Sequence, residues 1–395
     1  MRKRAIYIFG CIWFFVISIS HAQTWSQYKR LTWNSGNSIS AAVKANSSNV
    51  HMVWMDDFQG NYEIYYKRSS DGGTTWGGFK RLTYTSNDSG APALALDASG
   101  NTIHVVWTEK TIHPLVPVIY SISFEIYYKR STDGGNTWSS ARPLTWISQK
   151  SQSPSIVVDS NNTVHVVWYY SPRTNDNMIY EIFYKQSPNG GASWNATQRL
   201  TWSSGHSESP DIAVSFTNTI HVVWLMKMVG NTDLFYKRST NGGVSWTGAK
   251  RITWTSGFND APKIVTDSGN NLHIVWPDNS PSNYEIYHKK STDGGLTWPG
   301  IQRLTYTTGN TFGPELAVNS SNHVFLCWYD ITPGNNEIFF KQSTNGGGAW
   351  SPVTRLTWNP TNSNSPFLTL GAGNSLHVVY TDVFGSNEIL YKNRN

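Results

Sequence analysis

Acidic side chains recur at two fixed places along this 395-residue chain, and paired carboxylates are the groups that hydrolyse glycosidic bonds. The first place lies two residues after an aromatic residue, and its members are Asp56, Glu109, Asp278, Asp330 and Asp382. This set could form an acidic rim that binds cations or sugar hydroxyls. We favour the alternative that each carboxylate accepts hydrogen bonds from the backbone of its own loop.

The second set of acids opens a segment such as Glu63–Ser69 and recurs in every repeat. Its members are Glu63, Glu125, Glu181, Asp233, Glu285, Glu337 and Glu388. The chain also repeats an Arg-Leu-Thr segment, with small variations, once per unit, and we expect Glu63 and Arg81 to form an exposed ion pair. Such pairs contribute only tenths of a kcal/mol, about 0.2–1, so they would fix strand register more than stability.

Six histidines also share one place, three residues before an aromatic residue: His51, His104, His165, His221, His273 and His377. Histidine is a common metal ligand, but these six come from six different repeats and cannot converge on one ion. We therefore expect core packing with a hydrogen bond. The sequence shows no zinc-ligand spacing, no phosphate-binding loop and no nucleophile elbow, so it predicts no metal, no cofactor and no catalytic residue.

Two segments break the repeat. The step from the aromatic residue to the next acid is usually eight or nine residues, but it is 18 from Trp107 to Glu125 and 13 from Trp168 to Glu181. We predict a ligand-binding sector there, made of Tyr170, Arg173, Asp176, Glu109, His206 and Glu208. Aromatic rings with a few polar groups are typical of small-molecule pockets. Tolerated loop insertions explain the same lengths equally well.

The elements that position these residues are seven copies of one unit of about 52 residues. Each unit contains four apolar or aromatic runs of 4–8 residues bounded by Gly, Asn, Ser and Pro, which is typical of β-strands. We call them the inner, second, third and outer strands, exemplified in the third unit by the runs at 155–159, 165–168, 181–187 and 199–202. The sequence predicts an all-β, seven-bladed β-propeller with four antiparallel strands per blade.

The two ends of the chain are complementary. Residues 24–33 supply a lone outer strand, whereas the last unit stops after its third strand. We predict that the N-terminal strand completes the C-terminal blade and closes the ring, which removes its free edges. In such a ring, the second-to-third and outer-to-inner loops share one side, which we call the loop face.

The turns between third and outer strands carry a family resemblance. Ser69–Trp76, Ser131–Trp138 and Ser291–Trp298 match the Asp-box pattern Ser-x-Asp-x-Gly-x-Thr-Trp, and three further turns have Asn in place of Asp. The chain thus resembles the sialidase-like Asp-box (BNR) repeat propellers. A resemblance to sialidases implies a propeller of six blades. It also implies an active site with an arginine triad, a Tyr/Glu nucleophile pair and an Asp acid/base. Most arginines here belong to the repeated third and outer strands, so the resemblance lacks the triad.

The first residues resemble a targeting segment. Arg2, Lys3 and Arg4 precede an apolar stretch, and small residues then flank a cleavage point before Gln23, so we predict a signal peptide over 1–22 and one propeller domain over 23–395. Loss of three basic residues lowers the formal net charge from +6 to +3. A strongly basic charge was the main argument for a nucleic-acid partner, so the lower charge removes that argument. The apolar stretch is too short to embed the protein in a membrane. The sequence does not define the oligomeric state.

Three functions remain open. The first is a secreted, non-catalytic propeller that binds glycans or a surface polymer, with equivalent pockets between blades giving avidity. The second is a glycoside hydrolase or polysaccharide lyase acting at the loop face. The third is a structural or adhesive extracellular protein.

Overall fold

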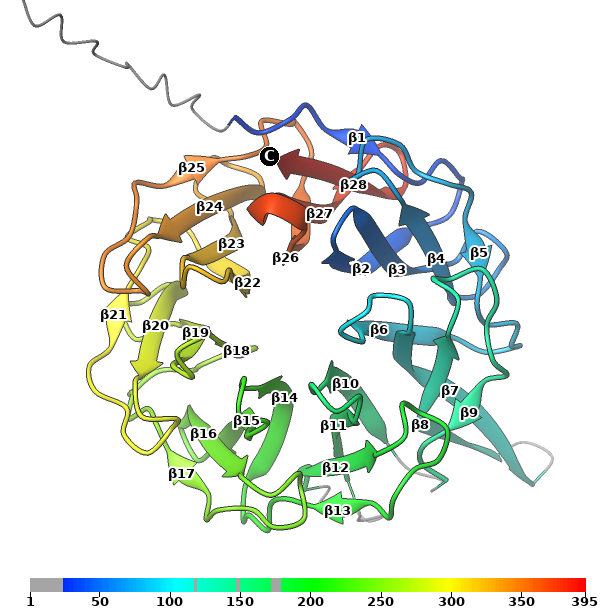
Figure 1. The fold of residues 1–395 in the computed structure, drawn as a ribbon, viewed down its shortest axis with the longest axis horizontal. Coiled ribbons are helices and arrows are strands. Elements are labelled where there is room, and N and C mark those ends of the chain that lie inside the picture. Colours follow the sequence, from blue (N-terminus) through cyan, green and yellow to red (C-terminus); the bar gives the residue numbers. More distant parts are fainter. Residues whose placement is uncertain (1–23, 117–118, 147–149, 172–178) are drawn as a thin grey trace, which may run out of the picture.

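Each sequence repeat folds into one four-stranded antiparallel sheet, and seven such sheets stand around a common central axis (Figure 1). The computed structural model describes residues 24–116, 119–146, 150–171 and 179–395. The predicted all-β, seven-bladed propeller is confirmed. The predicted signal peptide, 1–22, lies outside the described residues. Within the described ranges, no helix has the length and apolar character needed to cross a lipid bilayer.

The strands follow the chain from inner to outer within each blade. Blade 1 contains β2 (Ser38–Asn46), β3 (Asn49–Asp56), β4 (Glu63–Ser69) and β5 (Lys80–Arg81). Blade 2 contains β6 (Ser89–Leu96), β7 (Ile103–Val116), β8 (Ile119–Ser131) and β9 (Arg142–Pro143). Blade 3 contains β10 (Ser151–Val158), β11 (Val164–Tyr170), β12 (Glu181–Ser187) and β13 (Gln198–Arg199). Blade 4 contains β14 (His206–Val214), β15 (Ile220–Met228), β16 (Asn231–Ser239) and β17 (Lys250–Arg251).

The remaining blades repeat this order. Blade 5 contains β18 (Lys263–Thr266), β19 (Leu272–Asp278), β20 (Glu285–Ser291) and β21 (Gln302–Arg303). Blade 6 contains β22 (Thr311–Val318), β23 (Val324–Asp330), β24 (Glu337–Ser343) and β25 (Thr354–Arg355). Blade 7 contains β26 (Ser363–Leu370), β27 (Leu376–Val383), β28 (Asn387–Arg394) and β1 (Lys29–Arg30), with a short 3₁₀ turn, η1 (Ala372–Asn374), between β26 and β27.

The first strand of the chain closes the ring, as the sequence predicts. β1 is the outer strand of blade 7 and pairs antiparallel with β28, with Lys29 opposite Tyr391 and Arg30 opposite Leu390. The Leu31 amide continues the ladder to the Ile389 carbonyl at 2.8 Å. Both ends of the chain therefore belong to one sheet, and the N-terminal and C-terminal segments lie side by side (Figure 1).

The hydrophobic cores lie between the blades. In each blade the second strand is covered on both faces by neighbouring sheets. This explains why its sequence is a continuous apolar run and not an alternating pattern. One core joins Tyr66 and Leu82 of blade 1 to Leu94, Val105 and Trp107 of blade 2. Blade stacking, and not any single blade, therefore buries the apolar surface.

The glycine-rich turns between third and outer strands connect neighbouring blades. Within the first turn, the Asp71 carboxylate accepts hydrogen bonds from the Thr75 amide at 2.8 Å, the Thr75 hydroxyl at 2.6 Å and the Ser69 hydroxyl at 2.8 Å. These bonds, chiefly those from Thr75, lower the pKa of Asp71 to about 2. The Trp76 that ends this turn packs edge-on against Tyr391 of blade 7, with ring centroids 5.2 Å apart.

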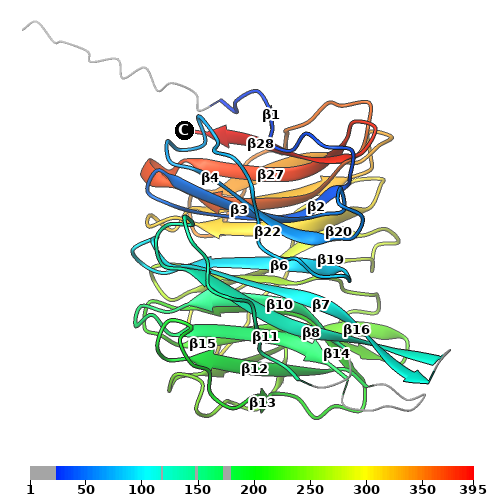
Figure 2. The same cartoon turned by 90° about the vertical axis from the view of Figure 1, so that its right-hand side faces the viewer.

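One insertion differs from its predicted form. The sequence predicts a long loop between Trp107 and Glu125, but the structure extends the strands instead. β7 and β8 continue their pairing out to Val116 opposite Ile119. The resulting hairpin projects beyond the rest of the molecule (Figure 2). Backbone pairing satisfies the polar groups of the inserted segment.

Candidate functional site

The first set of acids, two residues after the aromatic, is buried and hydrogen-bonded within the blades. Asp56 accepts hydrogen bonds from the Phe58 amide at 3.0 Å, the Asn34 side chain at 2.8 Å and the Trp54 indole at 3.2 Å. Asp278 and Asp330 accept bonds from loop amides two residues ahead. The preferred prediction, that these carboxylates bind their own loops, is confirmed for these three acids.

The second set of acids forms the predicted ion pairs within blades. Glu63 lies 2.8 Å from Arg81, and equivalent pairs occur in five other blades. The prediction that these pairs are exposed is wrong, because the Glu63 carboxylate is completely buried. In blade 2, Pro143 takes the place of the arginine, and Thr145 donates to Glu125.

Five of the six repeated histidines contact a tyrosine hydroxyl. His51 Nδ1 lies 2.7 Å from the Tyr66 hydroxyl, and the same distance recurs in four other blades. Blade 5 replaces the tyrosine with His288, 3.2 Å from His273. Over the described ranges, no group of three or more His, Cys, Asp or Glu residues could hold a metal ion. The expected packing role of these histidines is confirmed.

The residues predicted for the ligand-binding sector fall into three groups. Glu109 and Tyr170 are buried; Glu109 accepts bonds from the Ser89 hydroxyl and the Trp107 indole, and Tyr170 packs against Phe183. Burial raises the pKa of Glu109. Arg173 and Asp176 lie outside the described residues.

The other two, His206 and Glu208, reach the loop face. Glu208 forms an ion pair with Lys227 at 2.6 Å. The ring of His206 lies 5.4 Å from that of Tyr180, which in turn packs edge-on against Tyr169 at 5.2 Å. His206 Nδ1 is buried and has no hydrogen-bond partner among the described residues. Sequence reasoning thus located part of an aromatic and polar cluster at the junction of blades 3 and 4.

The channel mouth on the loop face contains functional candidates that the sequence reasoning missed. Each inner-strand segment begins with a buried Ser, Thr or Asn, as at Ser207, Asn259 and Thr311. The next residue differs in every blade: Ile39, Gly90, Gln152, Glu208, Asp260, Phe312 and Asn364. Variation at one position inside an otherwise regular repeat was the available signal.

Blades 5 and 6 give this mouth its most distinctive chemistry. Tyr284, Phe312 and Tyr329 form a chain of rings with centroids 4.7 and 5.9 Å apart. Asp260 is exposed beside them. Burial first, and then the Asp260 charge, raise the pKa of both Tyr284 and Tyr329. We define the mouth cluster as Tyr169, Glu208, Asp260, Tyr284, Phe312 and Tyr329.

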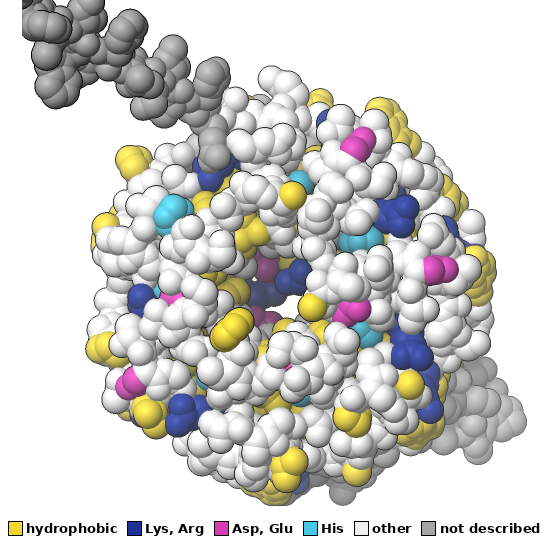
Figure 3. Space-filling model, viewed as in Figure 1, with side chains coloured by type: hydrophobic (Ala, Val, Ile, Leu, Met, Phe, Trp, Pro, Cys, Tyr) yellow, Lys and Arg dark blue, Asp and Glu magenta, His cyan; other side chains and the backbone are white. Residues whose placement is uncertain are grey.

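The mouth leads into a channel of about 800 Å³ whose wall includes Asp260, Phe312 and Tyr329. Deeper inside, charges of opposite sign neutralise each other. Lys263 lies 2.6 Å from Glu315, and Asp211 accepts bonds from the Ser155 hydroxyl at 2.8 Å and the Ile264 amide at 2.9 Å. Figure 3 looks into the channel from the end opposite the mouth and shows basic and acidic side chains inside it. Every arginine in the described ranges lies on a third or outer strand, away from this channel.

Comparisons with known proteins agree with this architecture. No protein-family model matches the chain. The chain is 23% identical over 304 residues to a curated sialidase from Bacteroides fragilis; the match covers 65% of this chain and 52% of that protein. This chain therefore spans about half the length of the curated relative it matches.

Three solved structures share the fold at low sequence identity. An ulvan lyase, bound to -[GlcA(1-4)Rha3S]-, has a TM-score of 0.63 at 9% identity, covering 91% of this chain and 94% of that one. A protein of unknown function from Dyadobacter fermentans gives 0.56 at 12%, covering 91% and 99%. The intramolecular trans-sialidase of Ruminococcus gnavus gives 0.52 at 12%, covering 93% and 97%. These likenesses show a common propeller fold.

Proposed function

We propose that this protein is exported and binds glycans at the mouth cluster, without a catalytic step of its own. One observation carries the proposal: the mouth is where the repeat departs from its regular pattern, and there it combines aromatic rings with carboxylates. Aromatic rings provide stacking surfaces and the polar groups fix orientation, which is the composition of a small-ligand site. The basic and apolar start of the chain supports export.

The relatives support the class of ligand. The curated relative is a sialidase, and two of the solved propellers act on glycans according to their descriptions. The placement of the repeated acids supports a binding role over a catalytic one. Carboxylates such as Glu63 and Asp56 are held inside the blades by several partners, so they are not available to a substrate at the face.

A specific observation favours catalysis as the second candidate. Asp260 lies close enough to Tyr284 and Tyr329 to raise the pKa of both hydroxyls. A tyrosine beside a carboxylate can serve proton transfer in a glycoside hydrolase or a polysaccharide lyase. The sequence-predicted Arg173 and Asp176 belong to this alternative.

A glycan array tests the proposal directly. Wild type is expected to bind at least one class of glycan, and Tyr329→Ala together with Glu208→Gln should weaken that binding at least about tenfold, because stacking and orientation are both lost. Phe216→Ala, an exposed aromatic outside the mouth, is the matched control and should bind normally. Unchanged binding by the mouth variant would contradict the proposal.

The same proteins also separate binding from catalysis. Wild type would be incubated with fluorogenic glycosides and with uronate polymers, and product would be measured over hours. We expect no turnover. Turnover that is abolished by Asp260→Asn, or by Arg173→Ala or Asp176→Asn, would replace the binding proposal with the enzymatic one.

A further inference from the structure

The aromatic residue that follows each outer strand is exposed in every blade. We call these seven residues the edge aromatics: Trp33, Tyr84, Trp146, Trp202, Trp254, Tyr306 and Trp358. Between 66% and 75% of each residue's surface is accessible. The tryptophans of the second strands, such as Trp107 and Trp224, are by contrast completely buried. Folding therefore does not use most of the apolar surface of the edge aromatics.

Most edge aromatics are held rigidly by a cation of their own blade. The Arg30 guanidinium lies 4.4 Å from the Trp33 ring centroid, and the corresponding arginine lies 4.5–5.8 Å from the ring in five other blades. That arginine is itself fixed: Arg199 pairs with the buried Glu181 and donates Nε–H to the Thr201 carbonyl at 2.7 Å. Because an immobilised guanidinium already orders the ring, the ring loses little conformational entropy when a ligand stacks on it.

The edge aromatics also mark the junctions between blades. In each blade a third-strand lysine donates to the carbonyl of the residue two before the preceding blade's edge aromatic, as Lys237 does to Leu200 at 2.6 Å. At four junctions this ammonium lies within 6.0 Å of the edge aromatic's ring centroid. Each ring thus has hydrogen-bonding groups of two blades beside it.

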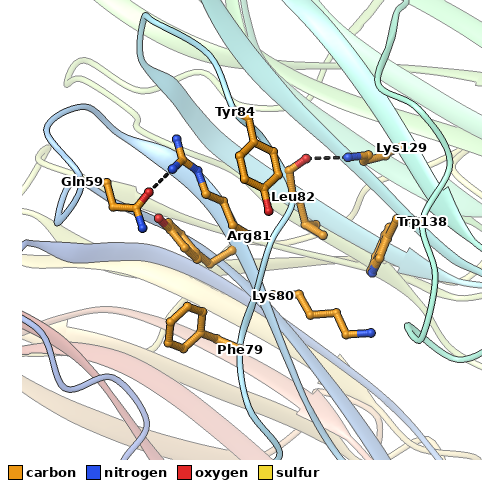
Figure 4. Close-up of a pocket in the computed structure, with 9 residues that line it drawn as sticks. Gln59, Phe79, Lys80, Arg81, Leu82, Tyr84, Lys129 and Trp138 are labelled. Atoms are coloured by element: carbon orange, nitrogen blue, oxygen red, sulfur yellow. Dashed lines mark hydrogen bonds between the residues drawn. The ribbon is translucent and has the colours of Figure 1, made fainter.

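At the junction of blades 1 and 2 these groups line a pocket of about 480 Å³ (Figure 4). Tyr84, Phe79 and Trp138 supply its aromatic surfaces, and Arg81 donates to Gln59 on one side. On the other side Lys129 donates to the Leu82 carbonyl at 2.6 Å. None of the residues that line this pocket lines the channel.

The charged groups beside each ring indicate the kind of ligand. Protein partners and membranes require a contiguous apolar patch. Here each edge aromatic belongs to a different blade, and a guanidinium or an ammonium lies 4.4–6.0 Å from its ring centroid. One isolated ring flanked by polar donors matches one sugar residue, whose apolar face stacks on the ring while its hydroxyls accept hydrogen bonds.

We propose that the edge aromatics form a second class of binding site, seven in number, at which a polysaccharide chain stacks one sugar residue per blade. This inference rests on the proposed function only for the class of ligand, because the edge aromatics are separate from the mouth cluster. Repetition around the ring would give avidity to a polymer from individually weak contacts.

Chemical footprinting tests the placement without mutation. The protein is treated with N-bromosuccinimide, alone and with soluble xylan, mannan, alginate, pectin or chondroitin sulfate, and tryptophan oxidation is mapped by peptide mass. In the free protein Trp33, Trp202 and Trp254 should oxidise before the buried tryptophans. A polymer that binds should slow their oxidation several-fold. Protection by none of the five polymers, or protection elsewhere only, would overturn the proposal.

Affinity gels containing the protecting polymer give the second measurement. Replacement of Trp33, Trp202, Trp254 and Trp358 by alanine in one variant should weaken retardation at least about tenfold. Each single replacement should weaken retardation less than the fourfold replacement does. Phe216→Ala with Val244→Ala, which removes exposed apolar side chains outside the edge aromatics, should leave it unchanged. Thermal unfolding of each variant shows that the fold is retained.

The two proposals fail separately in this assay. Loss of polymer binding in the edge variant but not in Tyr329→Ala supports the edge sites independently of the mouth. Loss only in Tyr329→Ala overturns the edge sites and leaves the mouth proposal standing.

Discussion

At the scale of single residues, the buried histidines make the stability of the fold depend on pH. In five blades the repeated histidine is buried and its ring contacts a tyrosine hydroxyl. Burial lowers the pKa of His51, His104 and His377 to about 4 and that of His221 to about 3. The folded chain therefore keeps these imidazoles neutral at pH values where the unfolded chain, with ordinary pKa values near 6.5, takes up protons.

We expect the free energy of unfolding to fall as the pH decreases from about 6.5 to about 4. Each of these histidines contributes a slope of roughly 1.4 kcal/mol per pH unit in this window, and the contribution is fully present above pH 6.5. Urea titrations at several pH values between 7.5 and 4.5 measure the slope.

A paired variant identifies the groups responsible. The double variant His51→Gln, His104→Gln retains hydrogen-bonding capacity and removes two titrating groups. The pH slope of the free energy of unfolding should therefore decrease by twice the contribution of one histidine. Turn carboxylates such as Asp71, whose pKa is lowered to about 2, titrate below this window and do not confuse it. An unchanged slope in the double variant would contradict this explanation.

At the scale of the element, the glycine-rich turns combine backbone conformation with contact to the preceding blade. Gly242 and Gly243 both have positive φ, +67° and +84°. A Cβ at Gly242 would meet no atom within 4 Å, whereas one at Gly243 would lie 2.2 Å from the Tyr184 hydroxyl. That hydroxyl binds His165, and the Tyr184 ring packs against Trp246. The two positions thus separate backbone strain from blade packing.

Alanine substitutions should destabilise the protein in a graded order. Gly242→Ala should cost about 1–2 kcal/mol from left-handed backbone strain alone. Gly243→Ala should cost roughly 3 kcal/mol or more, because Tyr184 must also move. Gly248→Ala, in open space with no positive φ, is the control and should be near neutral. Chemical denaturation measures all three, and equal effects at Gly242 and Gly243 would refute the packing contribution.

The outer strands also show why the exposure of the edge aromatics could not be predicted from the sequence. The run Arg81–Tyr84 has the pattern of a regular strand, in which side chains alternate between two faces. The ladder actually ends at Leu82, whose amide binds the Ile64 carbonyl at 2.7 Å, and the Thr83 side chain then accepts the Ile64 amide at 2.8 Å. Once a hydroxyl replaces a carbonyl in the ladder, alternation no longer defines the direction of the next side chain.

At the scale of the whole molecule, the spacing of the repeats was sufficient to predict the fold. The seven blades and their closure followed from periodic aromatic, acidic and glycine positions. Of the mouth cluster only Glu208 was predicted; Asp260, Phe312 and Tyr329 were missed, because they line one channel only through the stacking of blades 5 and 6. The β7–β8 hairpin was likewise missed, because the residues that extend its pairing beyond Glu109 and Glu125 are not part of the repeated pattern.

Ring closure should make the first strand essential. Deletion of residues 24–33 removes Arg30 and Thr32, which bind the buried Glu388, and Trp25, which packs 5.1 Å from Phe340. It also exposes an edge of β28. We expect a loss of about 3–5 kcal/mol from the unpaired carboxylate alone, together with self-association through the free edge.

Light scattering and urea denaturation measure this outcome. A chain that begins at Thr24 is the control, and it should remain monodisperse with full stability. A deletion variant that is as stable and as monodisperse as the control would show that the fold does not need its first strand.

The adjacency of the two ends has a further consequence for how the ring can be cut. The Ser26 amide binds the Asn393 carbonyl at 2.8 Å, so a short linker could join Asn395 to Thr24 without moving either strand. The opening could then be transferred to an exposed loop in another blade, since circular permutation is tolerated at such sites. In the natural chain, anything fused to either end leaves from the same spot on the circumference, beside blade 7, and both faces of the disc stay clear.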